Sequence, residues 1–305
     1  MTSSPSRTAV RRPTALVGLA LAATLTLAAT GCGSGGSKSS GSGDSAAPAG
    51  ADAALFAKLP KDIQKSKVVR SVTDGTYPPN EFFAADGKTI QGFDIDLGNA
   101  LGKKLGVTVQ VDNGKFDAII TGIQGNRYDL ALSSITDNKE RQAKVDFVDY
   151  FTAGTSIVVK KGNPKAIKSL TDLCGKSIAV ESGTTQVELA NAQKCPAGQK
   201  ITTSEFPTDT DALATVTNGR NDAAMDDFPV ARYQAKQHPT DFEVVGEQYE
   251  SAPYGIAVNK SLAGLRDAMQ GALKAIIADG TYDQVLAKWD VSQGALKTAT
   301  INAGS

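Results

Sequence analysis

The sequence predicts an α/β fold of two similar α/β lobes, joined by two hinge crossings, with a ligand cleft between them. From Val68 onward, strand-like and helix-like segments alternate, a pattern typical of mostly parallel sheets. The segments QGNRYDLALSS and TNGRNDAAMDD also echo each other, since both lead from Gly, Arg and Asp into a short apolar strand that ends in two polar residues. Two similar lobes explain the echo, and a coincidence of composition is the alternative. Because ligands of open α/β sheets bind beyond the carboxyl ends of strands, Ser133-Ser134 and Asp226-Asp227 should both face the cleft.

Length and composition fit a globular protein with room for two cores. The chain has 305 residues, of which 41% are hydrophobic and 21% are charged. Lys plus Arg and Asp plus Glu both number 32, so no overall charge favours nucleic acid as a partner. The first 31 residues hold three arginines and no acid, and removing them leaves 29 basic against 32 acidic residues.

Residues 1–31 have the features of a secretory signal peptide. Arg11 and Arg12 precede the apolar run ALVGLALAATLTLAAT. A retained membrane anchor is the alternative, but the run is short for a span, and no later segment approaches that length. Twin-arginine export through Arg11-Arg12 also stays open beside the general secretory route.

Cys32 follows Ala29-Thr30-Gly31, which resembles a bacterial lipobox, although Ala29 replaces the usual leucine. In such a motif the cysteine is lipidated and becomes the mature N-terminus. The next residues, GSGGSKSSGSGDSAAPAGA, are rich in Gly, Ser and Ala and have no apolar periodicity. We therefore expect a lipid anchor at Cys32 and a flexible linker over 32–65.

The rest of the chain divides into lobe 1 over 66–155 plus 254–292, lobe 2 over 156–253, and a C-terminal tail over 293–305. In lobe 1 we expect strand Val68–Thr73, a helix opened by Gly92 with Asp94 as its N-cap, strand Val107–Val111, helix Phe116–Gln124 and strand Tyr128–Ser134. The apolar runs Ser156–Lys160 and Tyr254–Asn259 would carry the chain into lobe 2 and back. The segment LRDAMQGALKAIIADGTYDQVLAKW predicts two final helices that pack on lobe 1.

Two cysteines remain in the folded part, Cys174 and Cys195. In an exported protein such a pair favours a disulfide, and two free thiols are the alternative. The spacing of the two cysteines and the absence of a histidine near them argue against a zinc site.

Candidate binding residues in lobe 1 follow the strand that ends at Ser133-Ser134. Thr136 offers a backbone N–H and a hydroxyl, and Arg141 carries the guanidinium best shaped to bind a carboxylate in a bidentate way. A surface ion pair between Arg141 and a neighbour such as Asp137 is the alternative.

In lobe 2, a strand leads through Glu181 to Thr185 at the start of a helix, where free N–H groups and the helix dipole can hold a carboxylate. Any capped helix looks similar, so this signal is weak by itself. Tyr77 and Phe116 follow predicted strands and could sandwich a ligand, although core packing is the usual role of a single aromatic ring.

The chain resembles a known family: the polar amino-acid-binding proteins of ABC importers, which have the type II periplasmic-binding-protein fold. The resemblance extends from about Lys67 to Trp289. Its motifs, in order, are TDGTYPPNEF, GFDIDLGNAL, FDAIITGI, SSITDNKERQAKVDF, VESGTTQ, NDAAMDD and IIADGTYDQVLAKW.

The resemblance implies a role for each matching residue. Arg141 matches the arginine that binds the ligand α-carboxylate, with Ser134 and Thr136 beside it, and Thr185 matches a backbone donor from lobe 2. Asp227 matches the aspartate that accepts the α-ammonium group. Tyr77 and Phe116 match the aromatic walls, and Asp74 matches a polar residue near the ligand side chain. Two departures are Asn80, where many relatives have Phe, and the loop TDNKER, where TITPER is common.

Selectivity should come from the wall outside these generic contacts. Asp74, Glu181 and Asp226 could place three carboxylates there, which would favour a cationic side chain: arginine, lysine, ornithine or histidine. The alternative is a neutral polar ligand such as glutamine, with Glu181 or Asp226 turned away toward a basic residue.

The expected function is capture of an amino acid by hinge closure and its delivery to the ABC permease subunits. We expect a monomer, exported and lipid-anchored at the extracytoplasmic face of a bacterial membrane, with no cofactor, metal site or nucleic-acid partner. An enzyme such as a dehydratase on the same fold is less expected, because the single histidine, His238, lies away from the cleft motifs. An extracytoplasmic sensor subunit would have the same pocket.

Overall fold

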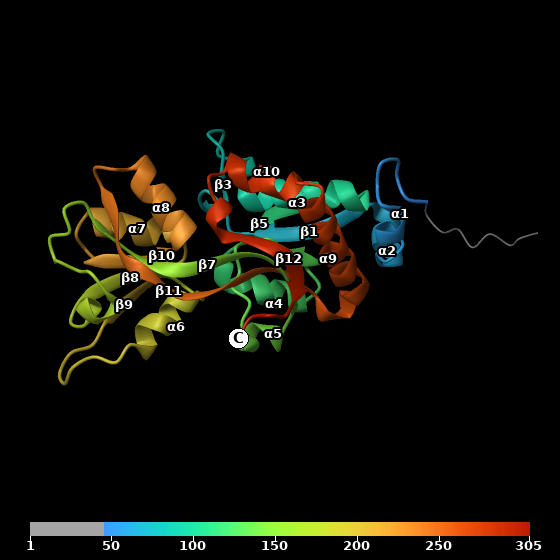
Figure 1. The fold of residues 1–305 in the computed structure, drawn as a ribbon. Helices are drawn as coiled ribbons and strands as arrows, with labels where there is room; N and C mark the ends of the chain where they lie inside the picture. Colours follow the sequence, from blue (N-terminus) through green and yellow to red (C-terminus); the bar gives the residue numbers. More distant parts are fainter. Residues whose placement is uncertain (1–45) are drawn as a thin grey trace, which may run out of the picture. The chain divides into compact units, whose positions relative to one another are not determined.

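The computed structural model describes residues 46–305, and the fold follows from one continuous sheet with helices on its faces (Figure 1). The predicted signal peptide, Cys32 and the first part of the predicted linker, 32–45, lie outside the described residues. Within 46–305, no helix is both long enough and apolar enough to cross a bilayer.

The sheet has nine strands in the order β5-β1-β6-β11-β7-β10-β8-β9, with β12 on β7. Their bounds are β1 Val68–Thr73, β5 Thr108–Asn113, β6 Leu130–Ala131, β7 Asp146–Lys160, β8 Ser177–Glu181, β9 Thr202–Phe206, β10 Ala223–Asp227, β11 Phe242–Val258 and β12 Ala295–Ile301. A small second sheet joins β2 Thr76–Tyr77, β3 Glu81–Phe83 and β4 Ile90–Gln91. The helices are α1 Ala53–Phe56, α2 Lys61–Ser66, α3 Phe93–Leu105, α4 Ile119–Gln124, α5 Lys139–Gln142, α6 Thr185–Ala192, α7 Asp209–Thr217, α8 Phe228–Gln237, α9 Ala263–Ala278 and α10 Thr281–Lys288.

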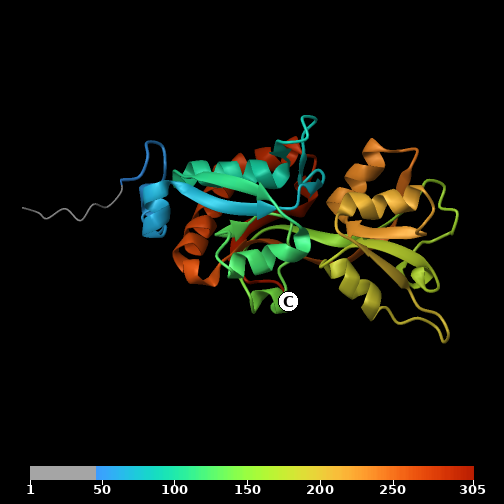
Figure 2. The same ribbon diagram turned by 180° about the vertical axis from the view of Figure 1, so that it is seen from behind.

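Buried side chains gather in separate cores for the two lobes. The cores of lobe 1 combine residues from the first part of the chain with residues after Tyr254, whereas those of lobe 2 use residues between Ile157 and Tyr249. Figure 2 shows the same division from behind, with α6, α7 and α8 around one part of the sheet and α3, α9 and α10 around the other. The distribution of the cores is consistent with the lobes expected from the sequence.

Two long antiparallel strands, β7 and β11, connect the lobes and belong to both of them. Their pairing runs from Phe242 with Lys160 to Val258 with Asp146, and the register shifts at three places between Val245 and Gly255. The sequence placed the crossings at Ser156–Lys160 and Tyr254–Asn259, but these runs are only the ends of the two strands. Each crossing is therefore part of a strand and not a separate linker.

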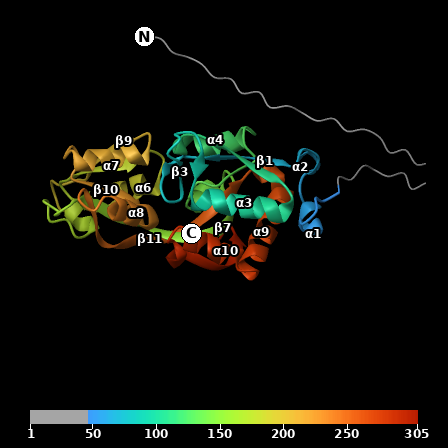
Figure 3. The ribbon, with the colours of Figure 1, turned by 90° about the horizontal axis from the view of Figure 1, so that it is seen from above.

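Lobe 1 buries α3 and α9 against each other and against the sheet, as Figure 3 shows from above. The structure corrects the prediction that Asp94 caps α3, because the N-cap is Gly92, whose φ of 140° is disfavoured for a side-chain-bearing residue. The carbonyl of Asn80 accepts the Asp94 N–H at 2.9 Å, so part of the first turn is satisfied by backbone. The Asp94 carboxylate points instead to Ser134, whose N–H it accepts at 2.8 Å.

Two segments that the sequence placed outside lobe 1 belong to it. Helix α1 lies within the predicted linker 32–65 and α2 begins there, yet Phe56, Leu59 and Ile63 are buried in the lobe 1 core. Apolar residues at this spacing can bury one side of a short helical pair, which a Gly/Ser-rich tether cannot do. The predicted tail 293–305 contains β12, which pairs with β7, so it is also part of the sheet.

Lobe 2 places α6 on one face of its strands and α7 and α8 on the other. Alternate residues of β10 show this, because Met225 packs in the core with α6 while Ala224 packs in the core with α7 and α8. Cys174 and Cys195 form a disulfide with their Cα atoms 5.6 Å apart. The bond joins the turn before β8 to the loop after α6, so both of its ends lie within lobe 2.

Candidate ligand-binding site

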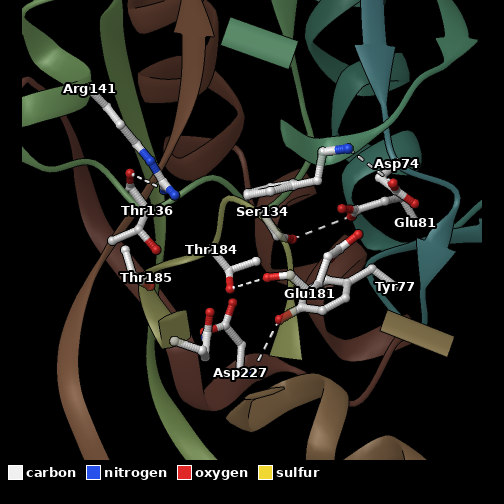
Figure 4. Close-up of a pocket in the computed structure, with 12 residues that line it drawn as sticks. Asp74, Tyr77, Glu81, Ser134, Thr136, Arg141, Glu181, Thr184, Thr185 and Asp227 are labelled. Carbon is white, nitrogen blue, oxygen red and sulfur yellow. Dashed lines mark hydrogen bonds between the residues drawn. The ribbon is translucent and has the colours of Figure 1, made fainter. Parts of the chain in front are cut away.

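A cavity lies between the lobes and is lined by residues of both. Its lining residues are Asp74, Tyr77, Glu81, Phe116, Ser134, Thr136, Arg141, Glu181, Thr184, Thr185, Gln186 and Asp227, most of which Figure 4 labels. The lining includes every binding residue expected from the sequence except Asp226, and it lacks Ser133, which was expected to face the cleft beside Ser134. Both lobes contribute to it, so the structure brings together residues more than 140 positions apart in the chain.

Arg141 lies at one end of the cavity in the short helix α5. The Asn138 side chain caps this helix by accepting the Arg141 N–H at 2.9 Å, which fixes the backbone that carries the guanidinium. The guanidinium donates to the carbonyl oxygens of Thr136 at 2.9 Å and Gly183 at 3.0 Å (Figure 4 shows the first). It also lies over the Phe116 ring, 5.7 Å from the centroid. Arg141 is 7% exposed, so the alternative of a surface ion pair does not describe it.

The charge of Arg141 is isolated in the cavity. Burial lowers the pKa of Arg141, while the carboxylates of Glu188 and Asp227 act in the opposite direction. A guanidinium nevertheless stays protonated in proteins. In the described part of the chain, the hydrogen-bond acceptors of Arg141 are backbone carbonyl groups, so this buried cation is well suited to an incoming carboxylate.

At the opposite side, Asp227 ends strand β10 and faces the same cavity. Gln186 donates to Asp227 Oδ1 at 2.8 Å, and the Asp227 N–H donates to the Tyr77 hydroxyl at 3.2 Å across the lobes. Burial raises the pKa of Asp227, whereas Tyr254, Tyr77, Gln186 and the charge of Arg141 lower it. An ammonium group beside Asp227 would favour the ionised form further.

Ser134 is held in a left-handed conformation, with φ of 49°, where the chain leaves β6. Its N–H donates to Asp94 at 2.8 Å and to the Tyr150 hydroxyl at 3.2 Å, so a buried network fixes this backbone. Its hydroxyl donates to Glu81 at 3.3 Å. The Asn80 amide donates to the same hydroxyl at 2.9 Å, so the position where many relatives have Phe is here part of the polar network.

Glu181 and Asp74 form an acidic wall between the two ends. Asp74 accepts the N–H groups of Thr76 at 3.1 Å and Phe116 at 3.2 Å, whereas the buried Glu181 Oε1 has no partner among the described residues. Burial, followed by the charges of Asp74 and Asp226, raises the pKa of Glu181 to about 9. Glu181 is therefore protonated at neutral pH until a cation enters the cavity.

The structure corrects the placement of Asp226. Asp226 and Asp227 are neighbours on β10 and therefore point to opposite faces of the sheet. Asp227 points to the side of α6 and the cavity, while Asp226 points to the side of α7 and lies beside Asp209. Its charge still raises the pKa of Glu181, but its carboxylate does not line the cavity.

Three lining residues were not assigned a role from the sequence: Glu81, Thr184 and Gln186. Glu81 lies in the quoted motif TYPPNEF, and Gln186 lies in VESGTTQ, so motif position alone could have suggested both. Thr184 caps no helix N–H with its side chain, and its hydroxyl donates instead to the Glu181 carbonyl at 2.7 Å. Burial, followed by the nearby Asp94, raises the pKa of Glu81 well above its usual value.

Other sequence alternatives can be compared with the same geometry. Tyr77 and Phe116 both line the cavity, so neither is only a core residue. His238 ends α8 and is exposed, 6.3 Å from the Phe242 ring and outside the cavity lining. Among residues 46–305, no group of His, Cys, Asp and Glu has the arrangement of a metal site.

The fold and the cavity have counterparts in known proteins. Residues 69–292 match the profile of the family described as bacterial extracellular solute-binding proteins, family 3. The arginine-binding protein of Corynebacterium glutamicum is 30% identical over 252 residues, covering 81% of this chain and 82% of that protein. The L-cystine-binding protein of Escherichia coli K12 is 30% identical over 217 residues, covering 71% of this chain and 80% of its own.

An ancestral arginine-binding protein, 39% identical to this chain, has been solved with two different ligands. Its glutamine-bound structure has a TM-score of 0.68 and covers 74% of this chain and 98% of its own. Its arginine-bound structure has a TM-score of 0.67 and covers 73% and 98%.

Proposed function

The chain belongs to family 3 of the bacterial extracellular solute-binding proteins, and on that premise we propose that it captures an amino acid with a cationic side chain and delivers it to an ABC permease. Arginine is the first candidate, followed by lysine, ornithine and histidine. Two features of the cavity support this proposal. Arg141 and Asp227, which we call the two generic seats, can bind the α-carboxylate and α-ammonium groups of any amino acid, and an acidic wall lies between them.

The generic seats bind the groups that all α-amino acids share. Arg141 provides a charged, two-pronged donor for the α-carboxylate, with Ser134, Thr136 and the start of α6 at Thr185 beside it. Asp227 provides the acceptor for the α-ammonium group. These contacts neutralise the zwitterion and cannot by themselves distinguish one amino acid from another.

The acidic wall is the observation that favours a ligand with a cationic side chain. Of the described residues that line the cavity, four carry a carboxyl group and one is a cation: Asp74, Glu81, Glu181 and Asp227, with Arg141. Among residues 46–305, the buried Glu181 Oε1 has no hydrogen-bond partner, and a buried carboxylate is costly unless a donor or cation satisfies it. A guanidinium or ammonium group would supply both hydrogen-bond donors and charge at this position.

Glutamine is the second candidate, and the protonation of Glu181 is what favours it. A protonated carboxyl offers one donor and one acceptor, which matches the primary amide of glutamine. The ancestral relative bound to glutamine supports this alternative, just as its arginine-bound structure supports the first. The two ligands differ in their requirement for an ionised Glu181.

The structure already shows contacts that a closing motion would make. Arg141 of lobe 1 donates to Gly183 of lobe 2, and Tyr77 of lobe 1 accepts from Asp227 of lobe 2. A ligand that touches both halves of the site stabilises the closed form, because an open form offers it only half of the contacts. The shifts of register in β7 and β11 lie between the lobes, where such a motion would bend the chain.

The location of the protein in the cell is proposed from its N-terminal sequence. A signal peptide over 1–31 and a lipidated Cys32 would place a monomer at the extracytoplasmic face of the membrane, tethered to it by the following Gly/Ser-rich residues. Mass spectrometry of the protein from bacterial membranes tests this, because it should find diacylglycerol on Cys32. Release of unmodified protein into the medium would contradict it.

Calorimetric titration of the soluble domain with arginine, lysine, ornithine, histidine, glutamine, cystine and glutamate tests the ligand class. We expect tight binding of at least one cationic amino acid and weak or no binding of glutamate. Tight binding of glutamine alone would replace the first candidate by the second.

A dehydratase on this fold would instead convert its substrate, so recovery of the bound compound unchanged after long incubation argues against an enzyme.

A further inference from the structure

The last residues of the chain lie against helix α5, which carries Arg141, the residue proposed to bind the ligand carboxylate. The C-terminus lies next to α5 in the views of Figures 1 and 2, although α5 and the end of the chain are far apart in sequence. We call residues Asn302–Gly304 the C-terminal segment. It follows strand β12 and leaves the sheet toward Asp137.

Hydrogen bonds join the C-terminal segment to both ends of the binding loop. Gly304 N–H donates to Asp137 Oδ2 at 2.8 Å, and the Gln142 amide donates to Asp137 Oδ1 at 2.8 Å and to the Gly304 carbonyl at 2.9 Å. Asp137 follows Thr136 directly, and Gln142 follows Arg141 directly. The contacts therefore lie at both ends of the loop that carries Arg141, the residue proposed to bind the ligand carboxylate.

The packing at Gly304 leaves no space for a side chain. A Cβ at this position would overlap the backbone carbonyl oxygen of Asp137. Gly304 and Asp137 are both buried, and Asp137 is 0% exposed. A buried carboxylate needs donors, and here the C-terminal segment supplies one of the two that the structure shows.

The C-terminal segment is itself fixed to strand β7. Asn302 exchanges backbone and side-chain hydrogen bonds with Phe147, accepting the Phe147 N–H at 2.7 Å. The N–H of Ala303 donates to Asp149 at 3.2 Å, and Thr300 donates to the same carboxylate at 2.7 Å. Strand β7 is thus connected to the binding loop through the end of the chain.

We propose that the C-terminal segment positions the binding loop from Thr136 to Arg141, so that Asp137, Gln142 and Gly304 are positioning residues for ligand capture. The proposal rests on the proposed function, in which Arg141 binds the ligand carboxylate. Without the bonds to Gly304, Asp137 loses a donor while buried, and the loop must move to recover one. The distance between the Arg141 guanidinium and the Asp227 carboxylate then changes, so the two groups can no longer bind the α-carboxylate and α-ammonium groups of one amino acid at the same time.

Two substitutions test the connection from its two sides: Gly304→Ala, which inserts a methyl group against Asp137, and Gln142→Met, which removes the amide while keeping the length of the side chain. Thr298→Val is the matched control, because Thr298 is an exposed residue of strand β12 outside the C-terminal segment. Arginine affinity and dissociation rate are measured by calorimetry and stopped flow. Hydrogen–deuterium exchange of the unliganded proteins reports on peptides that cover residues 136–142.

Both test variants should bind arginine about ten-fold more weakly, mainly through faster dissociation, and show faster exchange in residues 136–142. Exchange in strands β8 and β9 of lobe 2 and all properties of Thr298→Val should stay unchanged. Unchanged exchange of the loop in both variants would overturn the proposal, and so would faster exchange with unchanged affinity. If the parent protein binds no amino acid of the panel, the proposed function fails, and the exchange measurement alone decides the positioning role.

Discussion

The guanidinium of Arg141 in lobe 1 donates a hydrogen bond to the carbonyl oxygen of Gly183 in lobe 2, 3.0 Å away. The residue expected to hold the ligand carboxylate therefore also joins the two halves of the site. A single planar group with several donors in fixed directions can serve both purposes, which a point charge on a flexible stem cannot.

Arg141→Lys should weaken capture strongly while leaving the fold intact. The ammonium group keeps the charge but cannot donate in parallel to a carboxylate, Thr136 and Gly183, so we expect a loss of roughly 2–4 kcal/mol in binding. Calorimetry with arginine measures the loss. Arg127→Lys, at an exposed position outside the cavity lining, is the control, and a full-affinity Arg141→Lys protein would contradict the assignment of Arg141.

Glu181→Gln should change which amino acid is preferred. The neutral amide removes the charge that favours a guanidinium but keeps the shape of the wall, so arginine affinity should fall about 10- to 100-fold while glutamine affinity changes little. Competition between the two ligands gives the ratio directly. Glu247→Gln removes a charge from an exposed position of β11 and should leave the ratio as it was. An equal loss for both ligands would remove Glu181 from the selectivity wall.

Arginine binding should release a proton near neutral pH. Burial and the charges of Asp74 and Asp226 raise the pKa of Glu181 to about 9, whereas a bound cation favours its carboxylate, so the proton leaves when the ligand enters. Affinity for arginine should accordingly increase as the pH rises toward 9, by up to about ten-fold per pH unit. Titrations in buffers of different ionisation enthalpy detect the released proton. The release should be absent in Glu181→Gln, and its persistence there would assign it to another group.

Asp290→Asn should weaken capture modestly and in a salt-dependent way. Asp290 of lobe 1 accepts from Arg232 at 3.0 Å and Lys236 at 3.1 Å, both on α8 of lobe 2, so these ion pairs form only when the lobes are together. Exposed ion pairs contribute little, and we expect about a two- to five-fold loss of affinity at low salt that disappears at high salt. Asp267→Asn breaks an exposed ion pair with Arg266 inside lobe 1 and serves as the control. Equal effects of the two substitutions would argue against a connection between the lobes.

Asp149→Asn should stabilise the protein at alkaline pH. Burial, with a contribution from the neighbouring Asp137, raises the pKa of Asp149 to about 7. A carboxyl with a raised pKa contributes stability that is complete below its unfolded pKa near 4 and is lost as the pH rises through 7. Asparagine keeps the acceptor for Thr300 and Ala303 without the charge, so the gain in unfolding free energy should be roughly 1–3 kcal/mol at pH 8 and absent near pH 4. Thermal unfolding at both pH values measures the difference, and an equal gain at both would mean that charge is not the cause.

Local sequence patterns predicted the parts of the fold that depend on local chemistry. Strand β1 has the predicted bounds, and the helix Phe116–Gln124 forms as a 3₁₀ turn, Phe116–Ala118, followed by α4. Family motifs, rather than patterns of charge, pointed to most of the cavity lining. The error at Asp226 came from treating neighbouring carboxylates as a pair, although strand geometry sends adjacent side chains to opposite faces.

The remaining differences arise from contacts between distant parts of the chain. Gly304 contacts Asp137 across 167 positions, and nothing in the sequence near Gly304 indicates such a partner. The burial of Phe56 and Ile63 against lobe 1 is equally non-local, because short helices obtain most of their stability from the surface that receives them. Asp94 failed as a predicted cap for the same reason, since backbone groups from the preceding turn had already satisfied the helix start.

The order in which the chain contributes to the two lobes constrains how it can fold during synthesis and export. Lobe 2 is built from one uninterrupted stretch, 156–253, so all of its residues are available before the last sixth of the polypeptide has emerged. Lobe 1 must instead wait for α9, α10 and β12, because α9 packs against α3 and fills the same core. Since domains fold as units when their residues become available, the half that begins the folded chain is the half that is completed last. An export pathway that delivers the chain from its N-terminus would therefore carry an unfinished lobe 1 through most of the process.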